Sequence, residues 1–248
     1  MRAPDWLTAR PVAHRGLHDI ARGIVENMPG AVQAAIAGNF SIEVDIQLSA
    51  DSEAMVHHDH ALGRLTETTG PLVDKTAAEL KALTFKDTAE RMMSLSDLCG
   101  LVAGRVPLVI EVKSHFDGDR KLVKRMAEVL ASYDGPAVGM SFDPDQVLAL
   151  RELLPSRPRG IVAQRSYEDE YWAYLTQQQR DNMLYLRHGF QTQPDFVAFR
   201  VDDLPAPAPW IARNVFGCAL LGWTVRTTEQ RTRVTQYADQ MIFEGFVP

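Results

Sequence analysis

The chain has 248 residues, of which 46% are hydrophobic and 23% are charged, and its formal net charge is -6. These values are close to those of globular proteins, so they exclude a fibrous or a largely disordered chain. The excess of acidic residues leaves no basic surface for nucleic acid, so we expect no nucleic-acid partner and expect an anionic ligand to be bound by a few local cations.

Short apolar, β-branched runs alternate with amphipathic segments along the chain, which is typical of a parallel sheet with crossover helices. We expect strands at 11–14, 41–49, 107–113, 137–142, 160–164, 195–201, 219–225 and 240–246. Helices are expected between them, for example over 119–133 and after Asp143, which is a suitable N-cap with Pro144 at the first helical position. Eight strands in a chain of 248 residues favour an α/β fold of the (β/α)₈, or TIM barrel, type.

One further extended run, at 54–60, interrupts this alternation. The link before it, at 49–54, is too short for a crossover helix, so we expect the run to pair antiparallel with 41–49 and to carry His58 to the barrel mouth. The sequence therefore predicts a single TIM-barrel domain over residues 1–248, with a small hairpin and loop-helix insertion at approximately 50–106. The segment LPAPAPW at 204–210 is expected to be a stiff connection.

Acidic side chains are concentrated on two of the predicted strands. Since side chains on a strand alternate between its faces, Glu43 and Asp45 share one face, and Glu111 and Lys113 share a face of the next barrel strand. Three buried carboxylates are costly without a cation, and an all-oxygen ligand set favours one divalent cation, Mg²⁺ or Ca²⁺. The alternative is a buried salt-bridge network in which Lys113 and Arg15 balance the acids.

Two histidines are expected near these carboxylates. His14 ends the first predicted strand, where this type of barrel has its catalytic groups, and His58 follows the antiparallel arm. Two imidazoles beside a metal ion are suited to proton transfer at neutral pH, while Arg15 and Lys113 supply the positive charge that a phosphoryl group requires. The pattern predicts a site for phosphate esters, in which we expect His18 to be an ordinary loop residue.

Six short motifs then identify a family. They are HRG at 14–16, EN at 26–27, EVDIQLSAD at 43–51, HD at 58–59, EVK at 111–113 and WTV at 223–225. In this order they resemble the motifs of the glycerophosphodiester phosphodiesterase family over nearly the whole chain. The resemblance implies a metal-dependent TIM-barrel hydrolase that converts a small-molecule glycerophosphodiester to glycerol 3-phosphate and an alcohol.

The resemblance also implies roles for individual residues. His14 and His58 would be the general acid and base; Glu43, Asp45 and Glu111 would bind the metal; Arg15 and Lys113 would bind the phosphate; Glu26, Asn27 and Trp223 would support the site or contact the substrate. The family usually has an Asp near a terminal TDYP, whereas this chain ends FEGFVP with Glu244 as the nearest acid. Because this difference from the family affects the shape of the pocket on the side of the alcohol, the sequence does not identify the alcohol of the substrate.

Other functions are compatible with the same residues. A phospholipase D-like or lysolipid phosphodiesterase would need an apolar rim, for which Leu62, Leu65 and Leu72 are candidates. A non-catalytic phosphodiester-binding protein and a zinc hydrolase with His14 and His58 as ligands are further alternatives. The sequence distinguishes neither Mg²⁺ from Ca²⁺ nor water from the substrate's 2-hydroxyl as the nucleophile.

Compartment and assembly are the last expectations. Cys99 and Cys218 are too few and too far apart for a disulfide framework or a metal knuckle. The first residues include no apolar signal segment, and no run of the sequence has the length of a transmembrane helix. We therefore expect a cytoplasmic protein without stable membrane association, while its oligomeric state is left open.

Overall fold

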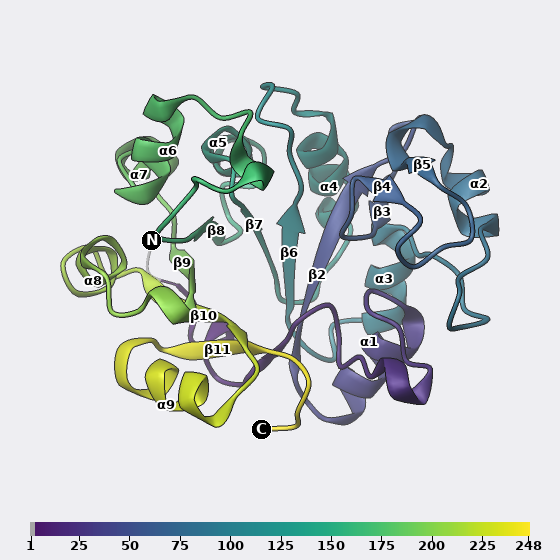
Figure 1. Ribbon diagram of the computed structural model, residues 1–248, viewed down its shortest axis with the longest axis horizontal. Coiled ribbons are helices and arrows are strands. Elements are labelled where there is room, and N and C mark those ends of the chain that lie inside the picture. Colours follow the sequence, from purple (N-terminus) through teal and green to yellow (C-terminus); the bar gives the residue numbers. More distant parts are fainter. Residues whose placement is uncertain (1–2) are drawn as a thin grey trace.

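Eight parallel strands form a closed barrel in the computed structural model, which describes residues 3–248 (Figure 1). They are β1 (Val12–Ala13), β2 (Ser41–Leu48), β6 (Leu108–Val112), β7 (Ala137–Ser141), β8 (Arg159–Ala163), β9 (Phe196–Arg200), β10 (Ala219–Val225) and β11 (Gln240–Phe243). The barrel closes at β1, where Val12 lies beside Ser41 of β2 and Ile242 of β11. The predicted TIM barrel is thus confirmed, and each predicted strand overlaps an observed one.

Helices surround this barrel (Figure 1). They are α1 (Pro29–Ala37), α4 (Lys121–Ala131), α5 (Pro144–Leu153), α6 (Gln177–Leu184), α7 (Gly189–Thr192), α8 (Pro207–Asn214) and α9 (Thr228–Tyr237). As expected, Asp143 caps α5 by accepting a hydrogen bond from the backbone N–H of Asp145 at 2.9 Å. The expected stiff connection at 204–210 is wrong, because α8 begins at Pro207, where proline fits the first helical turn.

An insertion follows β2. It contains β3 (Ala54–Val56), β4 (Ala61–Leu62), β5 (Gly70–Pro71), α2 (Ala77–Ala82) and α3 (Leu95–Val102). β3 pairs antiparallel with β2 as predicted, with Val56 beside Ile46, but it ends at Val56 and leaves 57–60 as a loop. Leu72, Leu80 and Met92 help to form a separate apolar cluster beneath this insertion. That the whole chain is one domain stays a prediction.

Short 3₁₀ helices complete the secondary structure of the described chain. They are Asp5–Leu7, Ile20–Arg22, Leu72–Asp74, Glu170–Trp172 and Val201–Asp203. None of the helices within residues 3–248 has the length and apolar character needed to cross a membrane. Both cysteines, Cys99 and Cys218, are free thiols.

The inward-facing side chains of the strands fill the barrel interior and, further along each strand, line a cavity at its mouth. Val12, Val109, Ala198 and Leu221 belong to one buried apolar cluster, together with residues of the other strands inside the barrel. Two positions after these four residues come His14, Glu111, Arg200 and Trp223, which all line one cavity. Because alternate residues share a face, each strand that fills the interior also presents a side chain at the carboxyl end of the barrel. This end is where TIM barrels have their active sites.

Candidate active site

Three buried carboxylates meet at the mouth of the barrel. Glu43 and Asp45 come from β2 and Glu111 from β6, where Asp45 and Glu111 lie side by side in the parallel register. One oxygen of each side chain lies within 4.8 Å of one oxygen of the other two. Glu43 and Asp45 are each 1% exposed and Glu111 is 8% exposed, so these acids share a site from which most water is excluded.

Two cations balance this charge in part. Lys113 Nζ lies 2.8 Å from Asp45 Oδ1 and 2.6 Å from Glu111 Oε1, and Arg15 Nε lies 3.4 Å from Asp45 Oδ2. Burial alone would raise the pKa of Asp45, but Lys113, His58 and Arg15 outweigh it and hold this pKa well below its usual range. Burial, reinforced by the Asp45 and Glu111 carboxylates, raises the pKa of Glu43 well above its usual value. Glu43 is therefore the acid that the protein compensates least.

The unsatisfied atoms of Glu43 fit a metal ion. Its Oε2 accepts a hydrogen bond from the backbone N–H of Arg15 at 3.0 Å, whereas its Oε1 is buried without a hydrogen-bond partner among the described residues. A buried carboxylate oxygen without a partner costs free energy, which contact with a cation would offset. Three carboxylates with no sulfur ligand form the kind of donor set that a hard divalent ion prefers. Glu43, Asp45 and Glu111 could therefore hold a metal ion.

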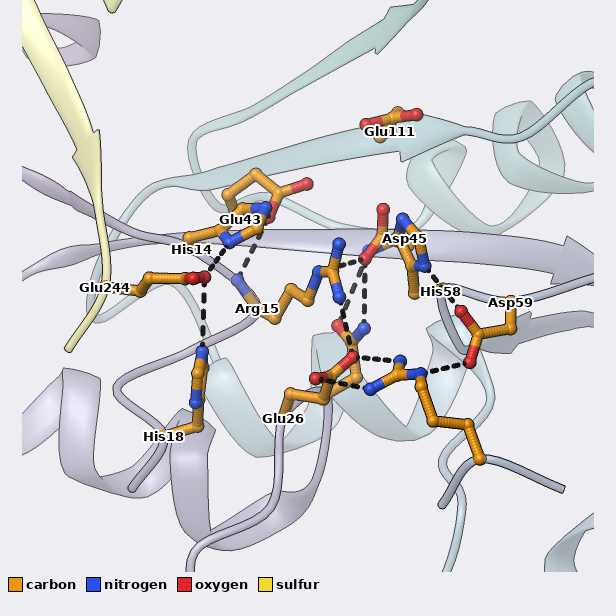
Figure 2. Close-up of polar contacts among 12 residues, drawn as sticks. His14, Arg15, His18, Glu26, Glu43, Asp45, His58, Asp59, Glu111 and Glu244 are labelled. Carbon is orange, nitrogen blue, oxygen red and sulfur yellow. Dashed lines mark hydrogen bonds and ion pairs between the residues drawn. The ribbon is translucent and has the colours of Figure 1, made fainter. Parts of the chain in front are cut away.

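His14 is fixed by a carboxylate from the last strand. It directly follows β1, and its Nδ1 hydrogen-bonds to Oε2 of Glu244, which directly follows β11 (Figure 2). Because a carboxylate can only accept, Nδ1 carries the proton, and Nε2 lies on the side of Glu43, 3.9 Å from its Oε2. Burial lowers the pKa of His14 even though Glu244 opposes this effect.

His58 is held in the same way from the other side. Its Nδ1 lies 2.8 Å from Asp59 Oδ1, and Asp59 Oδ2 accepts a hydrogen bond from Arg64 Nε at 2.6 Å. The Nε2-H₂ group of Gln47 donates to the backbone carbonyl of His58 at 2.8 Å and thereby fixes the loop after β3. Figure 2 shows His14 near Glu43 and His58 near Asp45, so the two imidazoles flank the acids of β2. Each has a carboxylate at Nδ1.

The first βα loop positions Arg15 and Asp45. Arg15 and Asn27 adopt left-handed backbone conformations, with φ of 55° and 59°, which are uncommon outside glycine and mark constrained positions. Asn27 donates from its backbone N–H to Arg15 O at 2.9 Å and from Nδ2 to Asp45 Oδ2 at 3.0 Å. Arg15 Nη1 donates to Glu26 Oε1 at 2.8 Å, and Arg64 Nη2 donates to the same oxygen at 2.7 Å. Burial alone would raise the pKa of Glu26, but Arg64 and Arg15 lower it to about 2.

A cavity of about 250 Å³ opens over these groups. Of the residues predicted for the site, those that line the cavity are His14, Arg15, Glu43, His58, Glu111, Lys113 and Trp223. Glu26, Asn27 and Asp45 do not line it, but Glu26 and Asp45 contact Arg15, which does. Trp223 is held by a hydrogen bond from Nε1 to Ala198 O at 2.9 Å and by edge contact with Phe142, whose ring centroid is 5.6 Å away.

His18 lies in a loop, as predicted, and its side chain also approaches a residue of the site. Its Nε2 lies 3.5 Å from Oε2 of Glu244, the oxygen that also contacts His14, so His18 belongs to the polar network of the site. Burial alone would raise the pKa of Glu244, but His14, His18 and Arg226 lower it well below its usual range. No local sequence pattern reveals this network, because it forms only where the closed barrel places β1 beside β11.

Asp59 and Arg64 are functional candidates that the sequence analysis did not assign. Asp59 directly follows His58, and that adjacency was the available signal, because neighbouring side chains in a loop can reach one another. No neighbouring sequence pattern points to Arg64, because its partner in the site, Glu26, lies 38 positions away in the chain. Arg200, Asp202 and Arg226 also line the cavity and were not singled out.

Comparisons with known proteins agree with this geometry. A model of the glycerophosphoryl diester phosphodiesterase family matches residues 14–244. Glycerophosphodiester phosphodiesterase 1 of Homo sapiens is 25% identical, over 89% of this chain and 73% of its own length. The glycerophosphodiester phosphodiesterase of Caldanaerobacter subterraneus is 28% identical over 165 residues, which are 62% of this chain and 66% of that protein.

A solved structure supports the fold independently. A phosphodiesterase of Oleispira antarctica, in complex with its product sn-glycerol-3-phosphate, superposes with a TM-score of 0.76 at 18% identity, over 96% of this chain and 94% of that one. The match of the family model covers almost the entire barrel, from His14 to Glu244. The chain therefore belongs to the glycerophosphoryl diester phosphodiesterase family, and it is a hydrolase of glycerophosphodiesters.

Proposed function

We propose that this chain hydrolyses glycerophosphodiesters to glycerol 3-phosphate and an alcohol, with His14 and His58 as the proton-transfer pair and one divalent cation bound by Glu43, Asp45 and Glu111. The observation that carries the proposal is the arrangement of two carboxylate-backed imidazoles on either side of a buried acidic cluster with an unpartnered Glu43 oxygen. The product seen in the complex of the Oleispira antarctica phosphodiesterase supports the same reaction.

Arg15 and Lys113 would hold the phosphate. Both line the cavity, and the carboxylates around them outweigh burial and raise the pKa of each, so both stay charged. Burial alone would lower the pKa of Lys113, but Asp45 and Glu111 outweigh burial and raise it. Fixed cations that are held by other residues need no reorganisation during the reaction, so they stabilise charge that develops on the phosphoryl oxygens. Glu26 and Asn27 act through Arg15 and Asp45.

The histidines would move the two protons of hydrolysis. With Nδ1 engaged by Glu244 or Asp59, each ring has Nε2 available for the substrate. One Nε2 accepts the proton of the attacking hydroxyl, and the other Nε2 donates a proton to the oxygen of the departing alcohol. A divalent cation bound by the three carboxylates supplies positive charge against the phosphate. Trp223 presents an apolar surface to the substrate at the cavity wall.

The test is a coupled assay of glycerol 3-phosphate release from a panel of glycerophosphodiesters, with the purified protein before and after treatment with a chelator. We expect the chelator to abolish the activity and Mg²⁺ or Ca²⁺ to restore it. Restoration by Zn²⁺ alone would favour the zinc-hydrolase alternative. Absence of glycerol 3-phosphate with every diester and every ion would contradict the proposal.

The leucines that were candidates for the apolar rim of a lysolipid phosphodiesterase are not available to form it. Leu62 and Leu72 are only 5% and 1% exposed, because they pack in the apolar cluster beneath the insertion, and Leu65 packs against the same cluster. These leucines therefore provide no apolar rim around the cavity. A lysolipid belongs in the substrate panel, and its cleavage in place of the soluble diesters would reinstate the alternative.

A further inference from the structure

Arg200 lines the cavity, but the proposed reaction gives it no role. On β9, Phe196 and Ala198 pack in the barrel interior, so Arg200 is the next side chain on the inward face at the carboxyl end of the strand. It lines the same cavity as His14, Glu111 and Trp223. The β9 strand therefore contributes an arginine where neighbouring strands contribute residues proposed for substrate binding and catalysis.

The guanidinium of Arg200 is uncommitted. Among residues 3–248 no hydrogen bond or ion pair to it is found, whereas the other cavity cations are engaged, Lys113 with Asp45 and Arg226 with Glu244. Asp202 also lines the cavity, and its Oδ1 accepts a hydrogen bond from Gln230 Nε2 at 2.9 Å, which leaves its other oxygen available. This part of the wall thus offers one free cationic donor group and one free carboxylate acceptor.

These groups lie across the barrel from the proposed metal ligands. In the closed order of strands, β9 is four strands away from β2 in either direction, which is the largest separation that an eight-stranded barrel allows. Trp223 of β10 lies directly beside Arg200 in the parallel register and also lines the cavity. A diester whose phosphate is held by Arg15 and Lys113 would extend one of its two alcohol groups towards this wall.

We propose that Arg200, Asp202 and Trp223 form the subsite for the departing alcohol and select a polyhydroxylated alcohol, such as an inositol, a hexose or a second glycerol. The inference rests on the proposed function. A hydroxyl group both accepts and donates hydrogen bonds, so vicinal hydroxyls match a guanidinium next to a carboxylate. The indole of Trp223 contacts the C–H face of such a ring. The trimethylammonium group of choline has no hydroxyl, so it can neither accept a hydrogen bond from Arg200 nor donate one to Asp202 and gains nothing from these two side chains.

The experiment compares kcat/KM for glycerophosphoinositol, glycerophosphocholine and glycerophosphoserine in the wild type and in Arg200→Ala and Asp202→Asn. We expect the wild type to prefer glycerophosphoinositol. Each substitution should lower kcat/KM for that diester about 10-fold to 100-fold, the loss expected for a hydrogen bond to a charged group, and should change kcat/KM for glycerophosphocholine by less than about 3-fold. Arg187→Ala is the matched control, since Arg187 is an exposed arginine that stacks on Tyr185 outside the cavity.

Each other outcome overturns the inference in a distinguishable way. An equal loss with all three diesters would place Arg200 at the shared glycerol or phosphate and leave the proposed function intact. A loss confined to glycerophosphoserine would show an anion subsite, and no loss with any diester would show that Arg200 does not contact the substrate. Absence of glycerol 3-phosphate release in the wild type would instead refute the proposed function itself. Circular dichroism and thermal unfolding of each variant would show whether its fold is intact.

Discussion

Alanine at position 58 is expected to lower kcat for glycerol 3-phosphate release by about 10²-fold to 10⁴-fold, and alanine at position 14 by a similar factor. His58 and His14 line the cavity, and each has a carboxylate at Nδ1 that orients its ring. Loss of either ring removes one of the two proton transfers that hydrolysis requires. The measurement is steady-state kinetics at saturating diester and divalent cation.

The control for this experiment is His115→Ala. His115 stacks on His60 with ring centroids 4.2 Å apart but is absent from the lining of the cavity, so its replacement should leave kcat within about threefold of the wild type. A His14→Ala or His58→Ala protein that folds and keeps near-normal kcat would refute the assignment of that histidine.

Methionine in place of Lys113 is expected to lower the free energy of unfolding by about 3–5 kcal/mol and to abolish most of the activity. The side chain of Lys113 is 8% exposed and bridges Asp45 and Glu111 at 2.8 and 2.6 Å. Without the ammonium, three buried carboxylates lose their nearest compensating charge. Urea unfolding in the presence of a chelator measures the loss, and a saturating divalent cation should restore part of it.

Lys121→Met is the matched control for charge removal. Lys121 lies 3.2 Å from Asp119, but its side chain is 65% exposed, and surface ion pairs of this kind contribute about 0–1 kcal/mol. If Lys113→Met unfolded at the same urea concentration as the wild type, Lys113 could not be a main compensating charge of the three buried carboxylates.

The parts of the molecule that follow a local rule could be predicted from the sequence. The twofold period of side chains along a strand put Glu43 with Asp45 and Glu111 with Lys113, and the barrel places these pairs on adjacent strands. The hairpin after β2 followed from the length of its link, which is too short for a helix. These features depend on spacing alone.

The parts that depend on barrel closure could not be predicted. Glu244 contacts His14 across 230 positions of the chain, and the same Glu244 oxygen lies near His18. No local sequence pattern reveals contacts between residues so far apart. Arg64 reaches Glu26 through the folded insertion. The helix α8 was missed because its prolines favour a stiff extended segment in isolation and yet fit the first turn of a helix.

Anomalous diffraction from crystals soaked with Mn²⁺ tests the central claim most directly, because it locates the ion without reference to activity. The account predicts an anomalous peak within bonding distance of carboxylate oxygens of Glu43, Asp45 and Glu111, and its loss in Glu43→Gln. No peak among these residues, or a peak only at the neighbouring group of His14, His18 and Glu244, would contradict it.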